Sequence, residues 1–179
     1  QQQRMGNEHP AAAPHAAYRC RGEDRWCVVA IFDEQEWQAL LGVMGNPSWA
    51  ADDRFGSAIG RKKHEAELDR LIEEWTALYP PEEVMRKLQA VGVPAGVVQN
   101  GADLHADPQL AHREHYQELE HLVIGRHTYD SMPFRLSKTP SDMRSAGPCL
   151  GQNNEYVYQQ ILGMPKEEYD ELLLQGVFE

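Results

Sequence analysis

Cysteine and long apolar stretches are both scarce in this sequence. The 179-residue chain has three cysteines, Cys20, Cys27 and Cys149, and no two of them form a Cys-x-x-Cys pair. An odd number of widely spaced cysteines predicts free thiols in a reducing, cytoplasmic compartment rather than a disulfide framework. No apolar run approaches the ~20 residues of a membrane-spanning helix. We therefore expect a cytoplasmic protein with no membrane partner.

The N-terminus lacks both an initiating methionine and the apolar segment of a signal peptide. The chain begins Gln1-Gln2-Gln3-Arg4-Met5, which is polar throughout its first four residues. The expectation is that the coding start lies upstream, or that the chain is a natural or engineered fragment.

Positive charge is in short supply. The sequence has 17 Lys and Arg against 28 Asp and Glu, which gives a formal net charge of −11. Such a charge repels nucleic-acid phosphates and anionic lipid. The most basic run, Arg61-Lys62-Lys63, is followed at once by Glu65 and Glu67, a pattern typical of a solvated helix face. Nucleic acid is therefore not an expected partner.

The short motifs that usually carry chemistry are also missing. There is no G-x-S-x-G and no glycine-rich phosphate loop. His112 and His115 are three residues apart rather than four, which favours a polar helix over a zinc site. We expect no metal, no tightly bound cofactor and no catalytic residue in this chain. Asp33 is suggestively placed between a buried strand and a helix, but Glu36 completes a capping pattern that accounts for it; a second role for Asp33 stays open.

The hydrophobic pattern predicts several helices and few, short strands. This balance favours an α+β fold, with a small antiparallel sheet packed against helices, then an extended arm and C-terminal helices. The four tryptophans are expected to form or border the core. The expected strands cover 18–20, 26–31 and 93–98, with a hairpin of 119–124 and 127–129 turning at 125–126; the expected helices cover 34–44, 57–78, 81–91, 107–115, 153–162 and 166–174.

These elements divide the chain into four predicted segments. Residues 1–16 are an extended leading segment, and 17–115 form a small α+β domain. Residues 116–152 form a hairpin and a connecting arm rich in Ser, Pro and Gly, and 153–179 form the C-terminal helices.

A series of short motifs, in one order along nearly the whole chain, resembles the C-terminal half of family III CoA-transferases. This family, also called CaiB/BaiF, includes α-methylacyl-CoA racemases. The matching motifs are Arg4-Met5-Gly6-Asn7-Glu8-His9-Pro10, Ala13-Pro14, Tyr18-Arg19-Cys20, Gly22-Glu23-Asp24, Met44-Gly45, Pro47-Ser48-Trp49, Asp52-Asp53-Arg54-Phe55, Gly92-Val93-Pro94-Ala95-Gly96, Asp107-Pro108-Gln109-Leu110, Pro133-Phe134-Arg135-Leu136-Ser137, Thr139-Pro140 and Pro148-Cys149-Leu150-Gly151.

The resemblance implies a fold in which two long chains interlock. Each has a large Rossmann-like domain and a small α+β domain, and this sequence corresponds to the small domain, the returning arm and the last helices. The family's nucleophile is an aspartate in the N-terminal half, and no residue here matches it. The resemblance thus implies a segment of an enzyme that moves CoA between an acyl-CoA and a free carboxylate, inactive alone. Its implied partners are acyl-CoA and either a second copy or the N-terminal half.

The resemblance also indicates four substrate-binding residues near the start of the small domain. His9, Ala12 and His15 match the region where some transferases carry a glycine-rich loop, although residues 10–15 here contain no glycine. Asp33 stands where racemase-like members have an acidic residue. Two alternatives remain open. One is a stand-alone, non-catalytic binding or interaction domain derived from the family, and the other is a piece of an acyl-CoA racemase.

Overall fold

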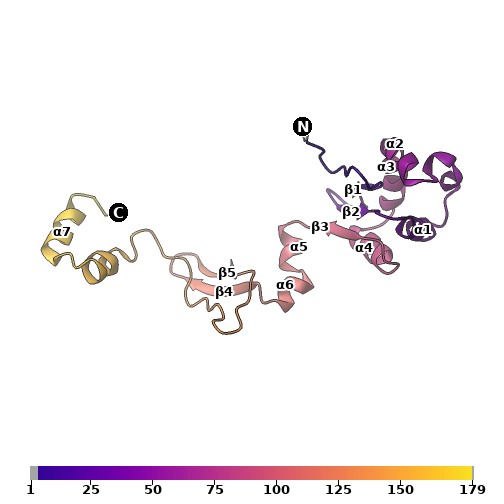
Figure 1. The fold of residues 1–179 in the computed structure, drawn as a ribbon. Coiled ribbons are helices and arrows are strands. Elements are labelled where there is room, and N and C mark those ends of the chain that lie inside the picture. The colour runs from indigo at the N-terminus through magenta and orange to yellow at the C-terminus, as the bar shows by residue number, and fades with distance from the viewer. Residues whose placement is uncertain (1–3, 179) are drawn as a thin grey trace. The chain divides into compact units, whose positions relative to one another are not determined.

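The computed structural model of the chain describes residues 4–178, which form two compact units. One unit extends to Gln99, and the other begins at Asn100. Both are drawn in Figure 1, and each is described by itself. Among the described residues, none of the helices combines the length and the hydropathy needed to cross a membrane. The division into four segments stays a prediction.

The first unit is built on a three-stranded antiparallel sheet in the order β1-β2-β3 (Figure 1). The strands are β1 (His15–Arg19), β2 (Trp26–Ala30) and β3 (Ala95–Val98). β1 begins three residues earlier than its sequence indicates. This extension has no signal in the sequence, because Ala16 and Ala17 have little preference for strands. Pairing with β2 nevertheless continues to His15↔Ala30, which satisfies the backbone hydrogen bonds of these residues.

The sheet has one buried and one open face because side chains alternate along each strand. On β2, Cys27 and Val29 are buried while Val28 between them is exposed. The buried face packs against α1 (Glu34–Val43), α3 (Glu65–Thr76) and α4 (Pro81–Gln89) around a core that includes Trp37, Leu68 and Leu88. The predicted α+β class, with helices packed on a small antiparallel sheet, is confirmed.

Three of the four tryptophans follow the prediction. Trp37 is 1% exposed, and Trp49 and Trp75 pack against the core from its edge. Trp26 does not: it lies on the open face of the sheet, opposite the neighbouring Cys27, where the Arg19 guanidinium stacks 4.4 Å from its ring centroid.

The helix starts follow from capping chemistry. The Asp33 carboxylate accepts the backbone N–H of Glu36 at 2.8 Å, as predicted, and the Glu36 carboxylate accepts the N–H of Phe32 at 2.6 Å. After α1, Gly45 adopts φ +81°, a conformation that favours glycine and turns the chain out of the helix. Pro81 occupies the first turn of α4, where its missing N–H costs nothing.

The single helix predicted over 57–78 is wrong. The structure has two helices, α2 (Ala58–Lys63) and α3, separated at His64, whose φ of −113° and ψ of 27° are not helical. The apolar spacing that suggested one helix begins only at Leu68. Helix α2, which precedes that stripe, buries a charged residue, Arg61, so the basic run that includes it is not a solvated face throughout.

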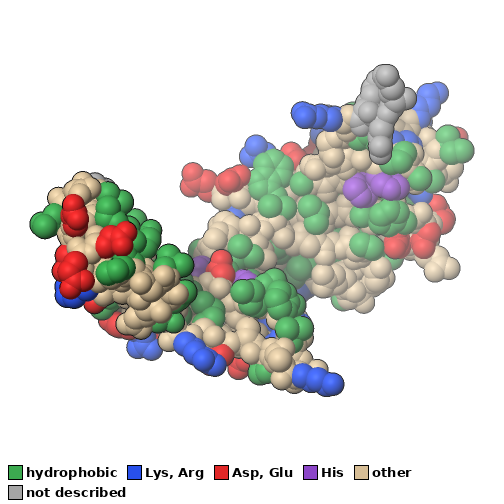
Figure 2. Space-filling view, turned by 60° about the vertical axis from the view of Figure 1, so that its left-hand side comes forward, with side chains coloured by type: hydrophobic (Ala, Val, Ile, Leu, Met, Phe, Trp, Pro, Cys, Tyr) green, Lys and Arg blue, Asp and Glu red, His purple; other side chains and the backbone are tan. Residues whose placement is uncertain are grey.

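The second unit has little interior. Its elements are α5 (Gly101–His105), α6 (Pro108–His112), the hairpin β4 (Tyr116–His121) with β5 (Gly125–Asp130), the π-helical turn η3 (Tyr156–Ile161) and α7 (Lys166–Leu174). Tyr169 is the one buried residue described between Asn100 and Phe178. Its ring stacks on Phe178 at 5.0 Å. Figure 2 shows hydrophobic side chains open to solvent on this part of the chain.

The hairpin turns at a different place from the one predicted. Leu122, Val123 and Ile124, expected in a strand, form the turn and are 78%, 77% and 61% exposed. The His121 ring explains the shift. Its Nδ1 accepts hydrogen bonds from the N–H groups of Val123 and Ile124, which holds residues 122–124 in a turn directly after His121.

Candidate functional site

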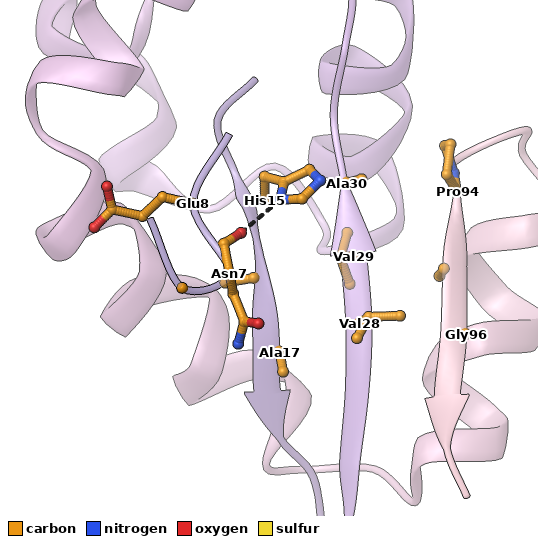
Figure 3. A pocket seen from close by; sticks show the side chains of 12 residues that line it. Asn7, Glu8, His15, Ala17, Val28, Val29, Ala30, Pro94 and Gly96 are labelled. Carbon is orange, nitrogen blue, oxygen red and sulfur yellow. Dashed lines mark hydrogen bonds between the residues drawn. The ribbon is translucent and has the colours of Figure 1, made fainter. Parts of the chain in front are cut away.

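A cavity of the first unit lies on the open face of the sheet. Its volume is about 530 Å³, and it lies between the leading segment at Gly6–Glu8 and the three strands. Figure 3 shows the strands side by side along it, with Pro94 at the far side. The Glu8 carboxylate points away from the strands, so the wall beside the sheet is mainly apolar (Figure 3).

Small side chains in one row leave this space open. Ala17 pairs with Val28, and Val28 pairs with Gly96, so the three residues lie across the sheet at one level. Val28 is 44% exposed, although valine side chains are usually buried. The row forms an apolar floor on which a ligand's hydrocarbon part could lie.

His15 lines the cavity, His9 lies in ring contact with it, and the hydrogen bonds of the two rings define their tautomers. His15 Nδ1 lies 2.7 Å from the carbonyl oxygen of Asn7, which can only accept, so Nδ1 carries a proton. His9 Nδ1 accepts the N–H of Ala11 at 3.2 Å, so its proton is on Nε2. The pair therefore offers a donor, His9 Nε2–H, and, in neutral His15, an acceptor at Nε2.

Phe32 joins the two histidines in a cluster of rings. The ring centroids of His9 and His15 are 5.3 Å apart. The Phe32 ring meets both edge-on, with its centroid 5.6 Å from that of His9 and 5.9 Å from that of His15. Phe32 is 54% exposed at the end of β2. Sequence reasoning did not single it out, since an aromatic residue just before a helix cap normally signals packing onto the helix.

The structure brings some of the predicted site residues together. His9 and His15 lie in ring contact, and Asp33 follows Phe32 directly, with its exposed carboxylate engaged in capping α1. Ala12 pairs with His9 through an isolated bridge, and its side chain is 2% exposed. A contact from Ala12 to a ligand would therefore use its backbone. The substrate-binding roles of all four residues stay predictions.

Several groups with raised pKa values lie on the core side of the sheet, away from the cavity. Burial raises the pKa of Cys20 to about 11 and that of Cys27 to about 12, so neither is a nucleophile at neutral pH. The Tyr18 hydroxyl donates to Asp69 at 2.6 Å, and burial raises the pKa of both groups. In the part of the chain that the structure describes, no three His, Cys, Asp or Glu side chains group as metal ligands. The cavity can bind, but it brings no nucleophile and base together.

The comparisons with known proteins agree on one family. The model of CoA-transferase family III matches residues 1–154. A protein of Mycobacterium tuberculosis named "Probable CoA-transferase" is 32% identical over 94% of this chain and 22% of its own length. The succinyl-CoA–D-citramalate CoA-transferase of Chloroflexus aurantiacus is 30% identical over 93% of this chain and 41% of its own. The formyl-CoA:oxalate CoA-transferase of Streptomyces avermitilis is 31% identical over 97% and 42%.

The solved structures give the same answer for the fold. A CaiB/BaiF family protein from Brucella suis superposes with a TM-score of 0.77 and 26% identity, over 89% of this chain and 40% of that one. The chain thus spans less than half the length of the relatives it matches. Because the family model covers most of its residues, the chain belongs to CoA-transferase family III.

Proposed function

We propose that this chain is the small-domain and C-terminal part of an enzyme that moves CoA from an acyl-CoA to a free carboxylate. The observation that carries the proposal is the family match over residues 1–154, together with relatives named for CoA transfer. The acyl-CoA is a substrate and no cofactor is held tightly. We place the reaction in the cytoplasm.

Within that enzyme, the open sheet face would border the acyl-CoA. The row of Ala17, Val28 and Gly96 offers an apolar floor. His15 offers an acceptor at its rim, and His9 beside it offers a donor. His9, Ala12, His15 and Asp33 are the proposed substrate-side residues. The cavity is suited to hold and orient a thioester rather than to attack it.

The chain alone is proposed to be inactive. Covalent CoA transfer needs a carboxylate nucleophile placed beside the thioester. Two aspartate carboxylates of the first unit have other duties: that of Asp33 caps α1, and that of Asp52 accepts from Arg54 at 2.8 Å. The nucleophile would come from an N-terminal half, and a homodimer is the proposed assembly.

A transfer assay tests this function. The polypeptide encoded by the complete gene and the 179-residue chain are each incubated with succinyl-CoA or formyl-CoA and with oxalate, malate or citramalate, and the thioesters are separated by chromatography. We expect transfer by the complete gene product and none by the chain. Transfer by the 179 residues, or a complete gene product that transfers with no pair, would overturn the proposal.

A matched pair of variants tests the site within the active protein. His15→Ala removes the acceptor at the cavity, and we expect it to raise KM for the acyl-CoA. His127→Ala, on exposed β5, is the control and should leave KM unchanged. Equal effects of the two variants on KM would show that the cavity takes no part in substrate binding.

A further inference from the structure

A second pocket lies wholly in the second unit and has a different chemistry. Its volume is about 410 Å³, and it lies between the end of α6, the start of β4 and the segment that follows β5. Two guanidinium groups line it, those of Arg113 and Arg135. In a chain of net charge −11, two arginines in one pocket mark a local departure from the overall field.

Each of the two arginines donates a hydrogen bond to a backbone carbonyl of the facing segment. Arg113 Nη2 donates to the carbonyl of Pro133 at 3.1 Å, and Arg135 Nη2 donates to the carbonyl of Arg113 at 2.5 Å. These two hydrogen bonds form a clamp and occupy one nitrogen of each guanidinium. They leave Nε and Nη1 of both groups without a hydrogen-bond partner among the described residues. Each guanidinium, exposed to solvent, is therefore anchored at one nitrogen and has donors to spare.

Neutral donors complete the lining. Ser131, Ser137 and Ser141 all line the pocket, and none of their hydroxyls makes a hydrogen bond to another residue that the structure describes. One carboxylate opposes them: Glu114 Oε2 lies 3.5 Å from Arg135 Nη2, and its side chain is 82% exposed. Such a distant, solvated pair neutralises little of the guanidinium charge. The pocket as a whole is rich in donors and positively charged.

We propose that this pocket binds a phosphate monoester. The three terminal oxygens of such a group match two rigid guanidiniums and several hydroxyls, whereas a carboxylate has only two oxygens to offer. The volume exceeds that of a phosphate, and Met132 and Leu136 give the remaining wall an apolar surface for the attached organic part. The 3′-phosphate of CoA and the phosphate of another metabolite share this chemistry. The site does not depend on the proposed transfer reaction.

Calorimetric titration of the full 179-residue chain, at constant ionic strength, tests the site. The probes are inorganic phosphate, CoA and dephospho-CoA, which lacks the 3′-phosphate. Phosphate should bind with a millimolar or tighter dissociation constant. Tighter binding of CoA than of dephospho-CoA would make CoA the source of the group. Equal binding of the two, with phosphate still bound, would favour another phosphorylated compound. An absence of phosphate binding at tens of millimolar overturns the proposal.

Paired variants separate the pocket from general charge attraction. Ser137→Glu places a carboxylate in the pocket without touching the clamp and should weaken phosphate binding at least about tenfold. Glu114→Gln removes the opposing carboxylate and should tighten it. The controls are Arg126→Gln and Glu118→Gln, at residues that form an ion pair of 2.8 Å on the hairpin, outside the pocket. Neither control should change the affinity for phosphate. Binding that responds to Arg126→Gln as much as to Ser137→Glu would show attraction without a site.

Discussion

The buried guanidinium of Arg61 donates from Nε to the carbonyl oxygen of Ala13 at 3.2 Å and so joins α2 to the leading segment. Arg61 is 2% exposed. It also donates to the carbonyl of Phe55 and to the Glu34 carboxylate, each at 3.2 Å, and lies 4.6 Å from the Trp37 ring centroid. One side chain thus fixes the backbone two residues before His15, which lines the cavity and begins β1.

Replacing Arg61 with alanine should destabilise the first unit strongly. The substitution leaves the Ala13 and Phe55 carbonyls buried without their donor, at a cost of roughly 1–3 kcal/mol each. We expect a loss of about 3–5 kcal/mol in urea unfolding, read from tryptophan fluorescence. Lys63→Ala, on the exposed side of the same helix, is the control and should stay within about 0.5 kcal/mol. A loss of the same size in both would show that the helix, not the buried guanidinium, is responsible.

Asp69 should make stability depend on pH. Burial raises its pKa in the folded chain, even though the Tyr18 hydroxyl bond opposes the shift. The folded state then holds a proton that the unfolded state has released, so stability falls as pH rises from the ordinary aspartate pKa through the raised one. Asp69→Asn keeps an oxygen acceptor for Tyr18 without the charge. Relative to the natural chain, this variant should gain stability between pH 4 and pH 7.

Thermal melting across that pH range checks the sign. Asp53→Asn, at an exposed position, controls for the loss of one negative charge. A gain for Asp69→Asn that shrinks as pH rises would contradict the assigned direction.

The three thiols should differ in reactivity. With pKa values of about 11 and about 12, Cys20 and Cys27 are thiolates only to about one part in a thousand and one in ten thousand at pH 8. Cys149 is partly exposed. A chromogenic disulfide reagent should therefore titrate one thiol quickly in the folded chain and three in guanidinium chloride. Cys149→Ser should abolish the fast phase, and a fast phase that survives would place it on a core cysteine.

The second unit should drive association. Leu162, Leu174 and Val177 are 66%, 90% and 58% exposed, and such apolar surface is uncommon on soluble monomers. We expect light scattering at micromolar concentration to give about twice the chain mass of 20.4 kDa. Truncation after Gly151 removes these residues and should return a monomer. A mass near 20.4 kDa for the whole chain would rule out the dimer.

Helix boundaries could be predicted from the sequence where neighbouring residues determine them. The cap at Asp33 follows from residue types at a fixed offset and is confirmed. The helix expected over 81–91 begins at Pro81, a residue type common at the first helical position. The break at His64 carries no such signal, since it is required by the burial of Arg61 against residues far away in sequence. Helix α5 was missed although Asn100 and Asp103 form a reciprocal capping box, because glycine and alanine follow the cap rather than an apolar stripe.

The candidate site could likewise be predicted only in part. His9 and His15 were found through family motifs, and their tautomers and ring contact required coordinates. Phe32 lies between a strand and a cap that were both predicted, yet its exposure depends on what the leading segment places beside it. The arginine pocket had no signal at all, because its two guanidiniums come from residues more than twenty positions apart in the sequence.

Gly96 gives the cavity a position at which its depth can change without cost to the core. A Cβ there would meet Val28 Cγ2 at 3.5 Å, an ordinary contact, so alanine fits and a longer side chain would rise into the open space. The side chains that pack the core lie on the other face of the same strands. Divergence at this one site could therefore change the size of the cavity from one descendant to the next while the scaffold beneath stayed the same.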